Sequence, residues 1–384
     1  MALTEKGKNA FLQIKKFFPK GQFTAKELSD ACGEKIVAAT LNGVVNNGYL
    51  TKIEGTSPIV YEAIEDIDSI VIDDDKKGCD NSNLHSAKRV KNDEFYTRYE
   101  DIETEVMKYR KYFRGKVIYL PCDDPAEKKS EFWSFFINNF DAFGLKKLIA
   151  THYDEFGKAY KIWVENDLNG DGYIDDDDVL QEDLEGNGDF RSPECIDILK
   201  ESDIVITNPP FSLFREFIHT IVNNNKYFLV IGNQNAFGYK EIFPLLKDNI
   251  IWTGYNMVKK FYQPDGSIKE FGNVCWFTNL PTSKRNDKMI LTKVYNPYDY
   301  PKYDNYDAIN VNRIIDIPKD YSGIMGVPIT FLDKFSPNQF TIVGMSASWD
   351  ESDEMKKIKT SAKRRHGPFI DGKEKYKRVF VKYN

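Results

Sequence analysis

The sequence has few of the residues that build disulfide and metal scaffolds. Its 384 residues include four histidines, none paired at helical spacing, and five widely separated cysteines that never form a C-x-x-C. Neither a disulfide framework nor a zinc ribbon fits this pattern. No apolar run approaches the roughly 20 residues of a membrane-spanning helix, and the N-terminus has no apolar signal core. We therefore expect a cytoplasmic protein with no membrane partner.

Basic residues are also fewer than acidic ones, which gives a formal net charge of −6, but the two kinds of charge are concentrated in different parts of the chain. Residues 165–190 hold eleven acidic residues and no basic ones, whereas residues 356–384 hold eleven basic and two acidic residues. A basic C-terminal segment is a candidate phosphate-contacting surface, and a merely solvated terminus is the alternative. The candidate DNA-binding residues are Lys363, Arg364, Arg365, Lys375, Lys377 and Arg378.

The first 65 residues have the pattern of a small separate domain. Apolar residues recur at helical spacing in 11–18, and Thr24 with Glu27 forms a capping box before a second helix. A third helix near 34–47 and two short strands, 49–53 and 59–63, complete a winged helix-turn-helix pattern. Such modules either bind DNA or mediate protein contacts, and the sequence does not decide between these two functions. The polar, aperiodic segment 66–92 is interpreted as a linker.

From residue 93 onward, strands alternate with helices. Apolar strands are expected at 117–120, 145–151, 203–207 and 227–232, with helices between them and a late antiparallel strand at 274–280. This alternation predicts an α/β catalytic domain over 93–282, with an open, mostly parallel, doubly wound sheet whose ligands lie at the carboxyl ends of the strands. Residues 283–384 are expected to form a separate, strand-rich C-terminal region.

The tetrapeptide Asn208-Pro209-Pro210-Phe211 carries the clearest chemistry. It follows the buried strand 203–207, where catalysis is expected in such a sheet. The Asn208 side-chain oxygen and the Pro209 carbonyl can accept hydrogen bonds from an exocyclic amine, which frees the nitrogen lone pair to attack an electrophilic methyl group. The prolines stiffen the turn, and Phe211 offers a face on which a base stacks. A plain strand-to-helix turn is the alternative.

Three further acidic or aromatic residues suit a nucleoside cofactor. Asp189 and Phe190, in EGNGDFRSPE, could hydrogen-bond the adenine N6 of S-adenosylmethionine and stack on its ring. Asp154 follows the second strand and is a weaker candidate for the ribose, because an acidic surface loop explains this residue better.

Together these residues resemble the EcoRI-type adenine-specific DNA methyltransferase family over about residues 90–384. The matching stretches, in order along the chain, are NDEFYTRYEDIE, YLPCDDP, FWSFFINNF, GNGDFRS, DIVITNPPFSLFREFI, FGNVCWFTNL, MGVPITFLDKF and FIDGKEKYKRVFVKYN. The resemblance implies a Rossmann-like methyltransferase that uses S-adenosylmethionine to methylate adenine N6 in double-stranded DNA. It also implies that residues 283–384 recognise the target.

The same resemblance assigns cofactor contacts near the first strand. Tyr96 and Thr97 would line the cofactor site, and Pro121, Asp123 and Asp124 would occupy the place of the glycine-rich loop that is usual in methyltransferases and is missing here. The segment 1–65 is an addition to the family pattern.

The acidic segment 167–178 matches the calcium-loop template, in which oxygen ligands stand at alternate positions. Asp replaces the usual bidentate Glu at its last position, and a solvated acidic loop is the alternative, so we expect at most a structural calcium. The candidate ligands are Asp167, Asn169, Asp171, Tyr173, Asp175 and Asp178.

Two other function classes remain open from the sequence. One is a winged-helix DNA-binding regulator with an inactive methyltransferase-like body, against which the intact Asn208-Pro209-Pro210-Phe211 argues. The other is a methyltransferase that acts on RNA or on a protein glutamine. The recognition sequence, a cognate restriction endonuclease and the choice between monomer and dimer are left undetermined.

Overall fold

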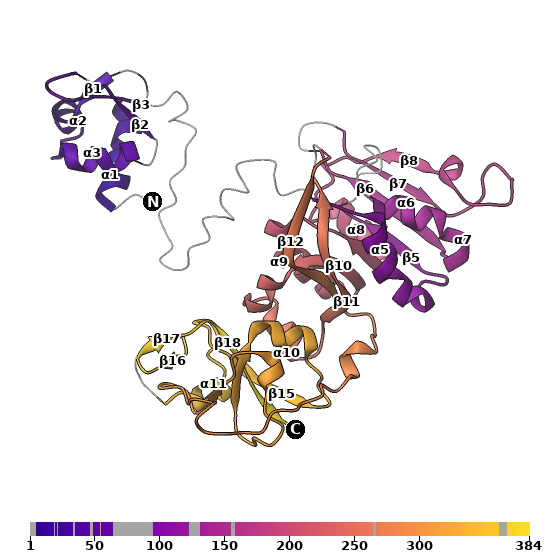
Figure 1. The fold of residues 1–384 in the computed structure, drawn as a ribbon. Coiled ribbons are helices and arrows are strands. Elements are labelled where there is room, and N and C mark those ends of the chain that lie inside the picture. Colours follow the sequence, from indigo (N-terminus) through magenta and orange to yellow (C-terminus); the bar gives the residue numbers. More distant parts are fainter. Residues whose placement is uncertain are drawn as a thin grey trace. The chain divides into compact units, whose positions relative to one another are not determined.

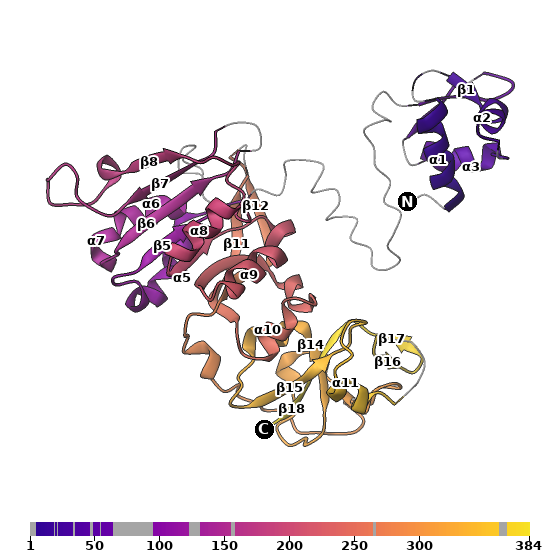
Figure 2. The same ribbon diagram turned by 180° about the vertical axis from the view of Figure 1, so that it is seen from behind.

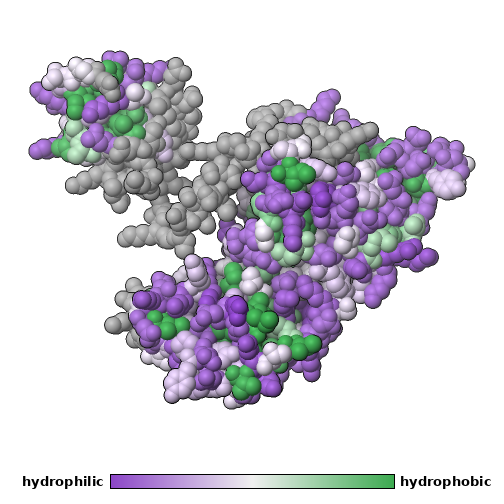
Figure 3. All heavy atoms as spheres, in the orientation of Figure 1, coloured by the Kyte–Doolittle hydropathy of each residue, from purple (hydrophilic) through white to green (hydrophobic). Residues whose placement is uncertain are grey.

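A computed structural model describes residues 5–18, 20, 22–33, 35–46, 49–53, 55–63, 95–122, 131–154, 158–263, 266–360 and 367–384 (Figure 1). The chain divides into two compact units, Met1–Asn81 and Ser82–Asn384. Among the described residues, no helix is long and apolar enough to cross a membrane. The face drawn in Figure 3 is mostly hydrophilic, and its hydrophobic side chains lie in small separate groups.

In its described residues, the first unit contains three helices and a small antiparallel sheet in strand order β1-β3-β2. The expected capping box is present, since the Glu27 amide donates to Thr24 Oγ1 at 3.3 Å and the Thr24 amide donates to Glu27 Oε2 at 2.7 Å. Phe11, Leu28 and Tyr61 are fully buried in its own hydrophobic core. The elements are α1 (Glu5–Phe17), β1 (Gln22–Thr24), α2 (Ala25–Cys32), α3 (Ala38–Asn46), β2 (Leu50–Ile53) and β3 (Val60–Ala63).

The second unit is built around a nine-stranded sheet, counted over the described residues, in the order β4-β11-β12-β10-β9-β5-β6-β7-β8. The strands are β4 (Tyr96–Thr97), β5 (Val117–Leu120), β6 (Lys147–His152), β7 (Tyr160–Val164), β8 (Leu180–Asp183), β9 (Ile204–Thr207), β10 (Tyr227–Asn233), β11 (Trp252–Tyr262) and β12 (Ile268–Thr278).

This sheet is mixed rather than mostly parallel. Only the central strands β10, β9, β5 and β6 pair in parallel, and the other described ladders are antiparallel. The reason is the length of the connections: β11 and β12 form a long hairpin, and β7 and β8 follow β6 without the crossover helix that a parallel pairing requires.

Helices cover both faces of the parallel centre, because alternate residues of these strands point to opposite sides. Ile118 and Ile206 pack in one core with the helices α5 and α6, whereas Tyr119 and Val205 pack in another with α8 and α9. Figure 2, seen from behind, shows α8 and α9 in front of the strands. The α-helices around the sheet are α5 (Tyr99–Val106), α6 (Glu131–Asn138), α7 (Phe140–Phe143), α8 (Pro193–Glu201), α9 (Phe214–Asn223) and α10 (Phe243–Lys247).

The order in which successive strands are added to the sheet reverses at β5, in the middle of the sheet. Strand β5 has β6 on one side and β9 on the other, and the intervening helices lie on opposite faces. The carboxyl ends of two such strands diverge and leave a crevice, which is where ligands bind in open α/β sheets.

The last hundred residues form a second sheet with strand order β13-β14-β18-β15. Its inner face shares one hydrophobic core with α9 and α10, and the Lys284–Asp333 ion pair (2.9 Å) reinforces the junction. The described elements of this region are β13 (Ile309–Asn310), β14 (Met325–Pro328), β15 (Phe340–Met345), α11 (Asp353–Ile358), β16 (Phe369–Ile370), β17 (Lys373–Glu374) and β18 (Arg378–Tyr383), of which β16 and β17 form a separate two-stranded sheet. The 3₁₀ helices of the second unit are η2 (Met107–Tyr112), η3 (Asp176–Asp178), η4 (Phe211–Leu213), η5 (Gln234–Gly238), η6 (Lys284–Asn286), η7 (Ile314–Asp316) and η8 (Ile329–Lys334).

Candidate active site

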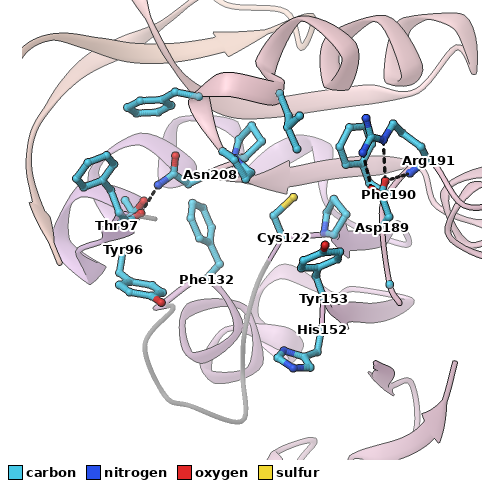
Figure 4. A pocket seen from close by; sticks show the side chains of 17 residues that line it. Tyr96, Thr97, Cys122, Phe132, His152, Tyr153, Asp189, Phe190, Arg191 and Asn208 are labelled. Atoms are coloured by element: carbon cyan, nitrogen blue, oxygen red, sulfur yellow. Dashed lines mark hydrogen bonds and ion pairs between the residues drawn. The ribbon is translucent and has the colours of Figure 1, made fainter. Parts of the chain in front are cut away.

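A cavity of about 310 Å³ lies at the carboxyl ends of β5 and β9, in the crevice that the topology predicts (Figure 4). Its size falls at the lower end of the usual range for ligand pockets. Nine of the residues singled out from the sequence line it: Tyr96, Thr97, Pro121, Asp189, Phe190, Asn208, Pro209, Pro210 and Phe211.

Asn208 directly follows the fully buried strand β9, so its backbone is fixed by the sheet. Its Nδ2 donates a hydrogen bond to the carbonyl oxygen of Phe95 at 2.5 Å. Its Oδ1 is buried and has no hydrogen-bond partner among the described residues. An unpaired buried acceptor costs free energy, so this oxygen is available for a donor that enters the cavity.

Phe211 begins η4, and the amide of Leu213 closes that turn onto the Pro210 carbonyl at 2.9 Å. The Phe211 ring is half-buried. It contacts Phe95 with ring centroids 6.0 Å apart and Phe271 with centroids 6.1 Å apart. The ring therefore lines the cavity while its other side packs in an aromatic cluster.

The pair Tyr96–Thr97 reaches the cavity through strand pairing, since β4 lies antiparallel to the far end of β11, with Thr97 opposite Phe261. Thr97 is buried, and its Oγ1 has no partner among the described residues. This hydroxyl is a second polar group in the cavity wall whose hydrogen-bonding capacity is unused.

The loop before α8 carries Asp189 and Phe190 to the opposite wall. Gly188 has a φ of +76°, and a Cβ there would lie 2.3 Å from the carbonyl oxygen of His152, so only glycine lets the loop approach β6 this closely. Hydrogen bonds from the Arg191 guanidinium (Nε at 2.9 Å, Nη2 at 2.6 Å) lower the pKa of Asp189 below its ordinary value. Phe190 is only 8% exposed and packs edge-on against Phe217.

The remaining predicted cofactor residues differ in position. The Pro121 carbonyl accepts from the buried hydroxyl of Thr151 at 3.3 Å, which holds the start of the loop after β5. Asp154 does not line the cavity, but its amide donates to the Asn187 carbonyl at 3.0 Å and so helps to dock the Gly188 loop. Asp123 and Asp124 lie outside the described residues.

Several other residues also line the cavity although the sequence did not indicate them, among them Phe132, His152, Tyr153 and Arg191. His152 and Tyr153 stand at the carboxyl end of β6, so their place after a predicted strand could have indicated them. Phe132 is one of several phenylalanines on α6, and the sequence pattern does not distinguish it from its core neighbours.

The acidic segment gives no support to the predicted calcium site. Among the described residues, no three metal-ligating side chains gather into a cluster. The carboxylates instead cap the loop's own backbone: Asp167 accepts from the amides of Gly170 and Gly172, and Asp178 accepts from those of Leu168 and Asp175. Of the other predicted ligands, Asn169, Asp171 and Asp175 each accept from the amide two residues on, and Tyr173 is 70% exposed.

The predicted DNA-contacting residues fall into three groups. Lys375 and Lys377 are exposed, and Lys363, Arg364 and Arg365 lie outside the described residues. The prediction for Arg378 requires correction, because its side chain is buried (7% exposed) and its Nε donates to Asn310 Oδ1 at 3.3 Å. Arg378 therefore ties β18 to β13 and is not presented to a phosphate.

Comparisons with known proteins agree on one family. The family model described as "Adenine-specific methyltransferase EcoRI" matches residues 83–384. The chain is 44% identical over 301 residues to the Type II methyltransferase M.EcoRI of Escherichia coli, covering 71% of this chain and 92% of that protein. It is 38% identical over 322 residues to the Type II methyltransferases M.MpnI of Mycoplasma pneumoniae (78% of this chain, 97% of the relative) and M.MgeORF184P of Mycoplasma genitalium (78% and 98%). No solved structure matches the chain significantly.

Proposed function

The chain belongs to the EcoRI family of adenine-specific methyltransferases, and from this premise we propose that it moves a methyl group from S-adenosylmethionine to N6 of an adenine turned out of duplex DNA. The observation that carries the proposal is Asn208 Oδ1, a buried acceptor without a partner among the described residues, in the wall of a cavity at the carboxyl ends of β5 and β9.

The cavity wall fits the cofactor chemically. Tyr96, Phe132 and Phe190 supply aromatic surface for a purine ring. Thr97 Oγ1, without a partner among the described residues, offers a hydrogen bond, and Arg191 lowers the pKa of the Asp189 carboxyl and so favours its ionised form. When bound, S-adenosylmethionine supplies a methyl group on a positively charged sulfur, which is an electrophile.

The residues of this chain then act on the acceptor amine. Asn208 Oδ1 accepts a hydrogen bond from adenine N6, with the Pro209 carbonyl as the second acceptor, and this draws the nitrogen lone pair out of the ring and toward the methyl group. Phe211 holds the extruded base by its exposed ring surface, which contributes about 1–3 kcal/mol per stacked base. The bond from N6 to the methyl group would form as the sulfur–methyl bond breaks, leaving a neutral thioether, and the nitrogen would then release its proton to solvent, so no base has to act before attack.

The remaining parts of the chain are assigned to the DNA. We infer that residues 283–384 recognise the target sequence, with Lys375 and Lys377 among the phosphate contacts, in a Rossmann-like methyltransferase. The unit before residue 82 precedes the matched family region, and its three helices and sheet support a winged-helix module that adds contacts to DNA or to a protein.

A substrate competition tests the proposal. Purified protein is incubated with methyl-tritiated S-adenosylmethionine and equal masses of duplex DNA, single-stranded RNA and a glutamine-containing peptide mixture. We expect label in the DNA alone and its loss in Asn208→Ala. The matched control is Asn279→Ala, because both ends of the Asn279 amide are bonded elsewhere, to Lys226 and Phe228. Preferential labelling of RNA or peptide would overturn the assignment.

A further inference from the structure

Four phenylalanine rings from three separate parts of the chain gather behind Asn208. Phe95 precedes β4, Phe211 begins η4, and Phe261 and Phe271 face each other across the β11–β12 hairpin at a centroid distance of 5.5 Å. The Phe271 ring lies 4.9 Å from Phe95 and 6.1 Å from Phe211, and the Phe261 ring lies 6.2 Å from Phe95. Phe95 and Phe211 line the cavity, whereas Phe261 and Phe271 do not.

The same hairpin also holds the backbone of the segment that carries the Asn208 anchor. Residues Tyr96 and Thr97 pair with Tyr262 and Phe261 of β11, so the segment is fixed on one side by strand pairing and at Phe95 by ring packing. Both attachments act on the residue whose carbonyl oxygen accepts the bond from Asn208 Nδ2.

That carbonyl decides which end of the amide faces the cavity. The two ends of an asparagine amide have nearly the same shape and opposite polarity. A carbonyl oxygen can only accept, so it selects the orientation in which Nδ2 turns toward Phe95 and Oδ1 remains for the amine. If the amide were reversed, the Nδ2 hydrogens would face the hydrogens of the target amine. Oδ1 would then face the Phe95 carbonyl oxygen, also an acceptor, across the present 2.5 Å contact.

We propose that the β11–β12 hairpin, through Phe261 and Phe271, is a positioning device that fixes the amide orientation of Asn208. The proposal rests on the function assigned to Asn208 above and extends it to two residues that touch neither the cavity nor the reacting atoms. They act on methyl transfer through the placement of one backbone carbonyl.

The first test separates the chemical step from cofactor binding. Phe271→Leu should slow single-turnover methyl transfer roughly tenfold or more, because small displacements of a reacting group are costly, while the Kd for S-adenosylmethionine stays within about twofold. Phe271→Tyr, which keeps the ring, should restore most of the rate. The control is Phe18→Leu in the first unit, another half-buried ring with an aromatic partner, Phe23, outside the cluster, which should leave the rate unchanged. Equal losses in both leucine variants would overturn the proposal.

A double-mutant cycle identifies the residue through which Phe271 acts. If the effect runs through Asn208, then Phe271→Leu should cost nothing further in an Asn208→Ala background and should keep its full cost in a Phe211→Ala background. The reverse pattern would mean that the cluster acts through base stacking and would refute the proposal.

A third test, by NMR spectroscopy, does not depend on methyl transfer activity. In ¹⁵N-labelled protein the Asn208 side-chain NH₂ should show slow hydrogen exchange in the wild type and in Phe18→Leu, and fast exchange in Phe271→Leu. If the wild type fails to methylate DNA, the proposed function falls, and this measurement still decides the positioning claim: unchanged exchange in Phe271→Leu rejects it.

Discussion

Replacing Asn208 by Asp isolates the bond between its amide and the Phe95 carbonyl. Aspartate has nearly the same shape and keeps an acceptor for the target amine, but its carboxylate has no donor for the Phe95 oxygen now 2.5 Å from Nδ2. Leaving a buried carbonyl unpaired costs about 1–3 kcal/mol, which corresponds to a rate loss of roughly 5- to 150-fold if the cost falls on the productive geometry.

Asn208→Ala should cost more, because it also removes the acceptor Oδ1. Loss of one preorganised hydrogen bond to a reacting group lowers the rate by roughly 10²–10³. Single-turnover transfer of tritiated methyl to DNA should therefore rank wild type first, Asn208→Asp second and Asn208→Ala last, with cofactor affinity nearly equal in all three.

The pH dependence of Asn208→Asp gives the sharpest check. Burial raises the pKa of a carboxyl group, and the protonated form regains a donor for the Phe95 carbonyl while its C=O faces the amine. The rate of this variant relative to wild type should therefore rise as the pH falls. A variant as fast as wild type at pH 8, or as slow as Asn208→Ala at every pH, would refute the reasoning.

The remaining predictions address the cavity walls and the first unit. Phe211→Ala should weaken capture of the target adenine, and a mismatch at that base should rescue it more than it helps wild type; equal rescue would remove the stacking role. Gly188→Ala should lower the affinity for S-adenosylmethionine in calorimetric titration, because its Cβ would lie 2.3 Å from the carbonyl oxygen of the last residue of β6; unchanged affinity would show that this loop does not shape the site. Deleting residues 1–81 should preserve folding and methylation, and a flatter salt dependence of DNA binding would identify the first unit as a DNA-binding module. Because Arg191 lowers the pKa of Asp189, the ionised pair adds stability that is present above the ordinary pKa of 3.8 and is lost as the pH falls through the lowered pKa; urea melts of Arg191→Gln should show lower stability at neutral pH and a difference from wild type that shrinks at acidic pH.

Local signals explain what the sequence predicted well. Strand β9 is a short, fully buried apolar run, and the Asn208 motif after it needed only that local context to be placed at the carboxyl edge of the sheet. The capping box of α2 is equally local, since Thr24 and Glu27 are three residues apart.

Long-range contacts explain what it missed. Glu105 is fully buried and accepts bonds from the backbone amides of Tyr255 and Asn256, 150 and 151 residues away, and burial raises its pKa. The role of Phe271 depends on a partner 176 residues earlier, Phe95, which no spacing rule connects to it. Charge alone likewise could not show that Arg378 turns inward to Asn310.

The most direct test of the central claim is the identity of the methylated nucleoside. The protein is incubated with DNA and S-adenosylmethionine carrying a trideuterated methyl group, and the digested nucleosides are separated by liquid chromatography and weighed by mass spectrometry. We expect trideuterated N6-methyldeoxyadenosine from the wild type and Asn279→Ala, and almost none from Asn208→Ala. Label on a cytosine, or undiminished N6-methyldeoxyadenosine from Asn208→Ala, would contradict it.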